Sequence, residues 1–245
     1  DDNTAILAIN NEYCNYELMF AHQGKQMTAE DVNKAQAAQG VSVLTLHKQT
    51  DGWRFTKDGK YNRRINANTP MMISGPAKGH ALLKTSADPK GERVLGTFNN
   101  CANGMTPWGT YLTCEENVNG YFGSTSQVEV TPAQARYGIG AEDAGWQWHT
   151  FDERFDLAKH PNECNRFGWV VEIDPKDPSS TPIKRTALGR FKHENAELVI
   201  DKDGHAVVYL GDDERGEHLY RFVSKGKYSP NDMAANRDLL DKGTL

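Results

Sequence analysis

Four short polar segments contain side chains that could bind a cation together. They are Asn10–Tyr13, Glu115–Asn117, Lys192–Asn195 and Gly211–Arg215, and we predict that each follows a β-strand. A carboxylate at the end of a buried strand is costly unless it is paired or bound to a cation. Carboxylate and amide oxygens are the usual ligands of Ca²⁺. The segments therefore predict a calcium site if the strand ends meet, although a solvated loop is the alternative for any one of them.

The cysteines add a second kind of ligand. Cys101 lies among Asn and Gly residues in the segment 99–110 rather than in an apolar run. A thiolate beside carboxylates favours a softer metal than calcium, such as iron or zinc. The alternative, a small buried side chain, is our interpretation of Cys14, Cys114 and Cys164. No two cysteines form a C-x-x-C pair, and four cysteines are compatible with up to two disulfides.

Two cationic side chains flank the acidic residues. His193 is a candidate ligand or general acid–base, and the alternative is a histidine hydrogen-bonded behind Glu194. Arg215 can hold an oxyanion through two hydrogen bonds, or it can neutralise Asp212 or Asp213. The sequence contains no G-x-S-x-G elbow, no P-loop and no G-x-G-x-x-G, so serine nucleophiles and nucleotide chemistry have no support.

The elements that must position these residues are mainly strands. Apolar runs rich in β-branched residues predict strands at 4–9, 41–46, 169–173 and 206–210. Asp-Gly pairs at 51–52, 58–59 and 203–204 predict hairpin turns. Many hairpin-linked strands indicate an all-β fold. We predict a β-propeller-like architecture, an incomplete propeller with minor helical insertions, although no repeat of blade length is visible.

Helices are the minor component. Thr28–Gln39 is the best candidate, because Thr28 can cap it, Asp31 lies three residues on and Gly40 follows. Thr131–Pro132 opens a second, short helix, and Asp232–Lys242 is the third. The stretch 138–165 shows no clear period and contains two tryptophans, so we interpret it as a functional or packing insertion.

Composition excludes some classes of function. The 245 residues carry a formal net charge of −5, which gives no reason to expect nucleic acid as a partner. No stretch approaches the roughly 20 apolar residues that cross a bilayer. The chain begins without a methionine or a signal peptide, so we expect a mature or trimmed chain.

Several segments resemble the PhoX alkaline phosphatase family. The longest is a block that runs through 99–104, 106–110 and 112–117 and includes Asn-Asn-Cys and Cys-Glu-Glu-Asn. Three others match in order at 11–13, 191–194 and 209–215, the last followed by 220–223. Asn103 departs from the family pattern, in which a small residue is expected. The resemblance spans nearly the whole chain.

The resemblance implies a propeller-like phosphomonoesterase that uses Fe³⁺ and Ca²⁺ and acts in the periplasm or after secretion. Cys101 resembles the iron ligand, and Glu116 and Glu194 resemble carboxylates that bind iron or bridge it to calcium. Glu12 and Asp213 resemble calcium ligands. We also expect Glu115 to be a metal ligand, and Arg215 and His193 are the catalytic candidates; these three are our own inference.

Family members are much longer than this chain. We therefore expect residues 1–245 to be a single domain, the N-terminal part of a longer family fold, whose site is completed by the remainder of its own chain, cleaved or not. The expected substrates are small phosphate esters. Two alternatives remain open: a calcium-dependent propeller hydrolase that acts on lactones or organophosphates, and a calcium-stabilised propeller that only binds. The acidic segments suit all three, and only the block around Cys101 favours the phosphatase.

Overall fold

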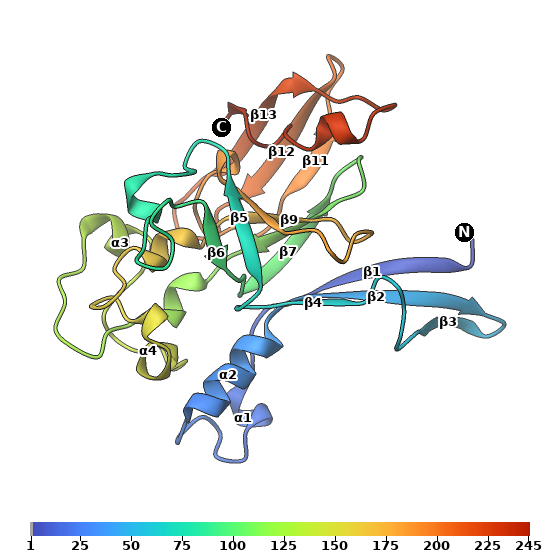
Figure 1. Cartoon of the computed structure of the whole chain (residues 1–245). Helices are drawn as coiled ribbons and strands as arrows, with labels where there is room; N and C mark the ends of the chain where they lie inside the picture. The colour runs from blue at the N-terminus through green and yellow to red at the C-terminus, as the bar shows by residue number, and fades with distance from the viewer. Residues whose placement is uncertain (1) are drawn as a thin grey trace.

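The computed structural model describes residues 2–245 as three β-sheets with few helices (Figure 1). The first sheet contains β1 (Thr4–Asn11), β2 (Gly40–Gln49), β3 (Gly52–Phe55) and β4 (Arg63–Ile65). The second contains β5 (Pro70–Ser74), β6 (Arg93–Leu95), β7 (Asn100–Met105), β8 (Tyr111–Glu115), β9 (Val170–Ile173) and β10 (Ile183–Arg185). The third contains β11 (Glu197–Ile200), β12 (His205–Gly211), β13 (Leu219–Lys227) and β14 (Gly243–Thr244).

The strand orders are simple. The first sheet is β1-β2-β3 with β4 also paired to β2, the second is β6-β5-β10-β9-β8-β7, and the third is β11-β12-β13-β14. Every pair is antiparallel except β5 with β10. The chain is thus mostly β-sheet without a closed barrel, which agrees with the predicted all-β class.

The helices are α1 (Tyr16–Met19), α2 (Ala29–Ala38), α3 (Pro132–Arg136) and α4 (Trp148–Phe151). Short 3₁₀ turns occur at Ala81–Leu83, Val118–Tyr121, Glu153–Phe155, Glu163–Arg166, Thr186–Leu188 and Ala234–Asn236. The predicted helix at Thr28–Gln39 is confirmed as α2, and Thr28 and Asp31 form the capping box at its start. The predicted helix after Thr131 is confirmed as α3.

The predicted helix at Asp232–Lys242 is wrong. Only Ala234–Asn236 forms a 3₁₀ turn there. The buried Asn236 side chain donates to the carbonyls of Ser229 and Asp232 and accepts the Ser229 N–H. Such local hydrogen bonds from a side chain to the backbone compete with helix formation.

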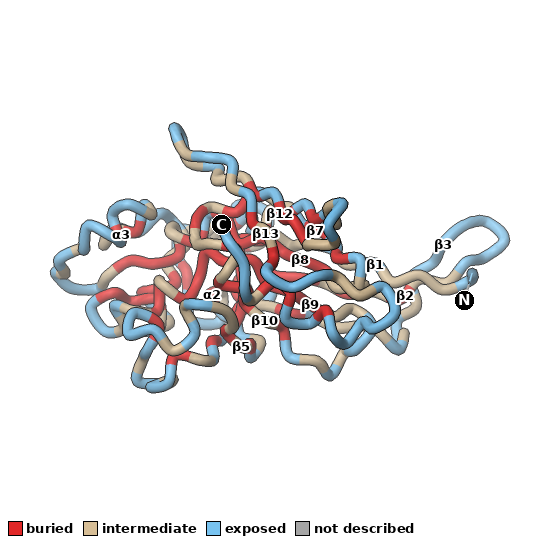
Figure 2. Tube along the Cα trace, turned by 90° about the horizontal axis from the view of Figure 1, so that it is seen from above, coloured by how far each residue is buried: buried red, intermediate tan, exposed pale blue. Residues whose placement is uncertain are grey.

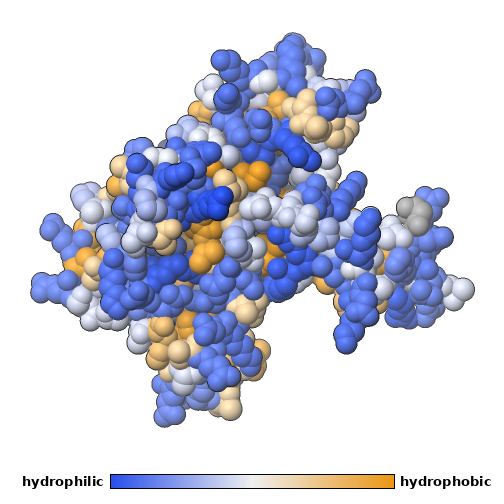
Figure 3. All heavy atoms as spheres, in the orientation of Figure 1, coloured by the Kyte–Doolittle hydropathy of each residue, from blue (hydrophilic) through white to orange (hydrophobic). Residues whose placement is uncertain are grey.

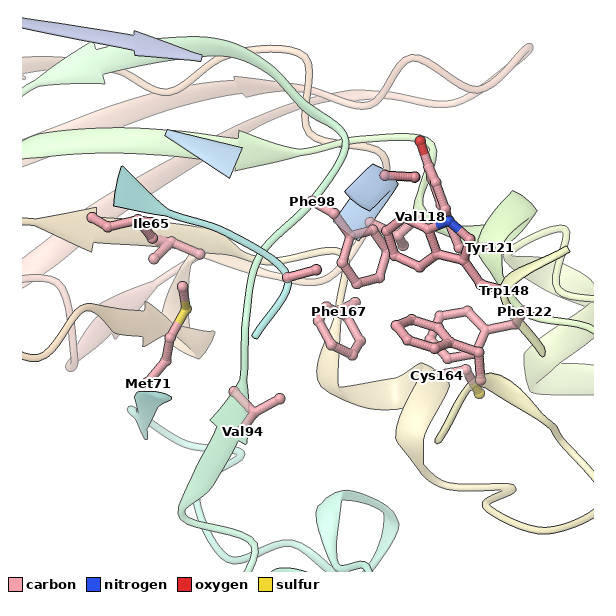
Figure 4. Close-up of a cluster of buried hydrophobic side chains, with 14 of the residues drawn as sticks. Ile65, Met71, Val94, Phe98, Val118, Tyr121, Phe122, Trp148, Cys164 and Phe167 are labelled. Atoms are coloured by element: carbon pink, nitrogen blue, oxygen red, sulfur yellow. The ribbon is translucent and has the colours of Figure 1, made fainter. Parts of the chain in front are cut away.

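The second sheet lies at the centre, with apolar side chains on both of its faces. A larger core on one side includes an aromatic group in which the Phe98 ring lies 4.5 Å from Phe167 and the Tyr121 ring 4.4 Å from Trp148 (Figure 4). Since Trp148 is fully buried, the stretch 138–165 serves packing, as one of its two interpretations expected. A smaller core joins this sheet to the third one.

The first sheet projects from the body as an arm, whose β3 end is exposed (Figure 2). Buried residues instead gather along the strands of the second and third sheets in the same view. The face seen in Figure 3 is mostly hydrophilic, with apolar residues in separate patches. Within residues 2–245, no helix is both long and apolar enough to cross a membrane.

Gly104 is where β7 touches the segment that leads into the third sheet. A Cβ at Gly104 would lie 1.8 Å from the carbonyl oxygen of Ala196, so no side chain fits without moving the backbone. We expect Gly104→Ala to lower the free energy of unfolding by about 1–3 kcal/mol, the usual cost of overpacking. Urea denaturation checks this. Gly140→Ala is the control, because a Cβ there meets nothing within 4 Å; equal losses in both variants would contradict the contact.

Candidate metal centre

Four carboxylates and one thiol gather where strands of the three sheets begin or end. Ligand atoms of Glu12, Cys101 and Glu116 all lie within 4.8 Å of one another. The same holds for Glu116, Glu194 and Asp213, so Glu116 belongs to both groups. We call these five residues the acidic cluster. The structure therefore brings together five of the six predicted metal ligands, from segments that are far apart in the sequence.

Three of the five, Glu12, Glu116 and Asp213, follow strands as the sequence indicated, whereas the strand that contains Cys101 was not predicted. Glu12 follows β1, Cys101 lies in β7, Glu116 follows β8 and Asp213 follows β12. Glu194 differs from the prediction, because its segment precedes β11 instead of following a strand. That segment is aligned with the end of β12 by backbone bonds. The Glu194 N–H donates to Gly211 O at 3.1 Å, and the Asp213 N–H donates to Lys192 O at 3.0 Å.

Negative charge is costly in this cluster. Burial raises the pKa of Glu116 well above its usual range, and a hydrogen bond with Asp213 and repulsion from Glu194 raise it further. Burial, followed by Glu194, also raises the pKa of Glu12. Burial and the surrounding carboxylates raise the pKa of the Cys101 thiol to about 12. A bound cation would offset this repulsion and favour the ionised forms of all these groups.

The donor set fits two kinds of cation. Carboxylate oxygens alone surround the position between Glu116, Glu194 and Asp213, which is the chemistry that Ca²⁺ prefers. The group of Glu12, Cys101 and Glu116 adds a sulfur, which suits a transition metal such as iron. Because Glu116 is common to both groups, it would contribute an oxygen to an ion held by either group.

Asn99 fixes the backbone on which Glu116 is carried. It adopts a left-handed conformation, with φ of 50°, which Asn tolerates better than most residues. Its carbonyl accepts the Glu116 N–H at 3.0 Å, and its Oδ1 accepts the Asn117 N–H at 2.7 Å. The Asn117 amide in turn donates to Glu116 Oε1 at 2.7 Å. Asn99 therefore fixes the backbone of Glu116, and Asn117 orients its carboxylate.

Cys101 lies in an irregular part of the β7–β8 ladder. Asn100 pairs with Glu115 and Asn103 pairs with Thr113, so Cys101 and Ala102 together face only one residue, as in a β-bulge. The Ala102 N–H leaves the ladder and donates to Glu194 O at 3.0 Å. This hydrogen bond attaches β7, which carries Cys101, to the segment that carries Glu194. Asn103, which departs from the family pattern, keeps a regular strand pairing.

Glu115 has a different role from its neighbour, and its assignment as a metal ligand is corrected. It is fully buried, and its Oε1 accepts from Lys184 Nζ at 2.7 Å. Its Oε2 accepts the N–H groups of Gly168 at 2.9 Å and Trp169 at 3.0 Å. Both carboxylate oxygens are therefore occupied by protein donors. Burial lowers the pKa of Lys184 to about 8, and the attraction of Glu115 opposes that effect.

His193 is not placed to act as a general acid or base, and that prediction is corrected too. Its ring is fully buried and lies 3.8 Å from the ring of Phe191. Nε2 is 3.0 Å from Gly189 O, so this nitrogen carries the hydrogen and donates it. Burial lowers the pKa of His193 to about 4, which keeps the ring neutral. The buried alternative is therefore the better description, although the contact is to Gly189 rather than to Glu194.

Arg215 is exposed and follows Asp213 by two residues. Among residues 2–245, no carboxylate forms an ion pair with its guanidinium, so it does not neutralise Asp212 or Asp213 in this structure. The other cysteines match their interpretation: Cys14, Cys114 and Cys164 are buried, and all four cysteines are free.

Two positioning residues had no role in the sequence interpretation. Lys184 is fully buried in the short strand β10, and its partner Glu115 comes from a strand 69 residues earlier. Its only sequence signal was a charged residue within a short strand. Asn99 belonged to the recognised block, but no pattern indicated its left-handed backbone.

Comparisons with known proteins identify the family. The family model of alkaline phosphatase PhoX matches residues 1–245. Among solved structures, the chain is similar to Pseudomonas fluorescens PhoX in complex with vanadate, a transition state analogue, with a TM-score of 0.97 and 59% sequence identity. The match covers 99% of this chain and 42% of that chain, so the chain spans less than half the length of that relative. No curated protein sequence matches.

If Glu115 and Lys184 form a structural ion pair, removing one partner should be worse than removing both. We expect Lys184→Met to lower the free energy of unfolding by about 3–5 kcal/mol, because it leaves a buried carboxylate without its cation. Adding Glu115→Gln to that variant should recover part of the loss. Urea denaturation of the metal-free proteins measures both. A double variant that is less stable than Lys184→Met would contradict the pairing.

Calcium should stabilise the protein through the acidic cluster. We expect the melting temperature to rise on adding Ca²⁺, because a ligand at about 100 times its dissociation constant adds about 2.7 kcal/mol. Glu116→Gln should remove most of that rise, since Glu116 belongs to both groups. Glu153→Gln is the control, with an exposed carboxylate outside the cluster. The cluster is not the calcium site if Glu116→Gln responds to calcium as the wild type does.

Proposed function

Because the chain belongs to the PhoX family of alkaline phosphatases, we propose that the protein hydrolyses phosphate monoesters at the acidic cluster. The observation that carries the proposal is the position of Cys101 within 4.8 Å of two carboxylates, one of which reaches two further carboxylates. The likeness to a PhoX protein with bound vanadate supports the same reaction. The substrates in this proposal are small phosphate esters.

We assign the metals by donor type. Cys101, Glu12 and Glu116 would hold Fe³⁺, and Glu116, Glu194 and Asp213 would hold Ca²⁺. Glu12, expected on the calcium side, thus moves to the side of the thiol. When bound, the metals supply Lewis-acid stabilisation of the charge on the transferring phosphoryl group.

The protein's own contribution is to hold these ligands in place and to admit the substrate. Glu194 and Asp213 are exposed, so the cluster opens to solvent on their side. Arg215 is exposed and follows Asp213 by two residues, and we propose that its guanidinium binds a phosphate oxygen through two hydrogen bonds. A cation that contacts the phosphoryl oxygens would stabilise the charge that develops on them during the reaction.

Two broader expectations belong to the same proposal. We propose that the three sheets are blade-like units of an incomplete propeller; support comes from the third sheet, whose four antiparallel strands follow in chain order. We also propose a periplasmic or secreted location, which rests on the family resemblance.

Removal of the thiol tests the proposed function. In the complete natural protein that contains these 245 residues, Cys101→Ala should lose iron and reduce turnover of p-nitrophenyl phosphate by at least about 100-fold. The reason is that a bound metal contributes several kcal/mol to the reaction, and about 1.4 kcal/mol corresponds to tenfold in rate. Metal analysis and steady-state kinetics measure the two effects, and Cys164→Ala, at a buried cysteine outside the cluster, is the control.

The outcomes separate this proposal from its alternatives. A Cys101→Ala protein that keeps both iron and activity would show that Cys101 is not a ligand. A wild-type protein that binds calcium without iron and hydrolyses lactones would favour the calcium-dependent hydrolase. Stabilisation by calcium without any turnover would favour the binding protein.

A further inference from the structure

We propose that Asn10 is a positioning residue of the acidic cluster, which fixes Cys101 and Glu12 relative to each other; this inference rests on the metal site of the proposed function. Asn10 lies near the end of β1, two residues before Glu12. Its side chain crosses from the first sheet to the irregular part of β7, where Cys101 lies. No ligand role is implied, because the amide bonds only to groups of the protein.

The donor side of the amide holds the bulge. Asn10 Nδ2 donates to Cys101 O at 2.9 Å and to Ala102 O at 2.8 Å. These are the two residues that the bulge leaves opposite one partner, so their carbonyls depart from the regular ladder. The two N–H bonds of one amide therefore fix the backbone from which the thiol projects.

The acceptor side fixes the amide itself. Asn10 Oδ1 accepts from the Tyr111 hydroxyl at 3.0 Å and from Thr113 Oγ1 at 2.8 Å. Both donors come from β8, the strand that pairs with β7 and leads to Glu116. Both N–H groups of the amide donate and its oxygen accepts two hydrogen bonds, so the amide has no unused hydrogen-bonding capacity. A flipped amide would place its oxygen against two carbonyl oxygens, which cannot donate. The positions of the amide nitrogen and oxygen are therefore fixed by their partners.

One side chain therefore links three segments that supply cluster residues. Its own backbone leads to Glu12, its donors hold the residue that carries the thiol, and its acceptor is tied to the strand before Glu116. Groups that orient metal ligands from behind in this way commonly change metal affinity by about 10- to 100-fold when they are removed. A role in stability alone would instead lower the melting temperature and leave the site unchanged.

Asn62 offers a matched control in the arm formed by the first sheet. Its Nδ2 donates to the carbonyls of Thr56 and Lys57, both at 2.8 Å, and its Oδ1 accepts the Thr45 N–H at 2.7 Å. It therefore bridges backbone groups as Asn10 does, but it belongs to neither group of the cluster. Replacing each residue by alanine removes a comparable set of hydrogen bonds.

The test uses Co²⁺ alone as the probe, because a thiolate bound to Co²⁺ gives a charge-transfer absorption that reports the Cys101 bond. The complete natural protein, freed of metal, is titrated with Co²⁺ as wild type, Asn10→Ala and Asn62→Ala, with Cys101→Ala to identify the band. We expect Asn10→Ala to bind Co²⁺ about 10- to 100-fold more weakly, with a diminished band. Asn62→Ala should match the wild type in both, even if its melting temperature falls.

The inference is overturned if folded Asn10→Ala keeps the wild-type affinity and band, or if Asn62→Ala loses both equally. It is also overturned if the wild type gives no thiolate band. Should Asn10→Ala fail to fold, Tyr111→Phe removes one hydrogen bond to Oδ1 and should give a smaller loss of the same kind; unchanged binding there would reject the role. If the Co²⁺ contrast appears but no phosphate ester is hydrolysed, the phosphatase proposal fails while the role of Asn10 remains.

Discussion

The repulsion among four carboxylates and a thiol is the constraint on which the rest of this structure depends. Burial adds to this repulsion, because it raises the pKa of Glu116, Glu12 and Cys101. A chain does not adopt such an arrangement for stability, because separating the groups would be more favourable. The arrangement becomes reasonable when a cation occupies the space between them, and the scaffold must hold the ligands until one binds.

The scaffold meets this demand with neutral hydrogen bonds rather than with counter-charges. The Asn99 side chain accepts the Asn117 N–H, and the Asn117 amide donates to Glu116 Oε1. The Asn10 amide donates to the carbonyl of Cys101. An amide can donate and accept at once, and it brings no charge that would compete with a metal. The positive charge of Lys184 does not enter the cluster. It pairs with Glu115, the residue that precedes Glu116. Lysine or arginine inside the cluster would neutralise the carboxylates and weaken metal binding.

Much of the fold could be predicted from the sequence, because its signals are local. The capping box at Thr28 and the proline at the start of α3 act within one helical turn, and both helices form where these signals placed them. The segment 232–242 has a helical composition as well, but the buried Asn236 bonds to Ser229 outside it. That partner lies beyond the window in which helix signals act. The predicted propeller needs relations between whole sheets, which no local pattern contains.

For the site, residue types were more predictable than residue roles. Glu115 and Glu116 are adjacent and chemically identical, and the sequence gives no reason to separate them. Successive side chains of a strand point to opposite faces, so a pair of glutamates at the end of β8 cannot both face the cluster. One of them had to enter the core, where only a buried cation makes it tolerable. His193 and Glu194 are divided in the same way: His193 is buried, whereas Glu194 belongs to the cluster. A pair of adjacent polar residues at a strand end is therefore better interpreted as one ligand and one anchor than as two ligands.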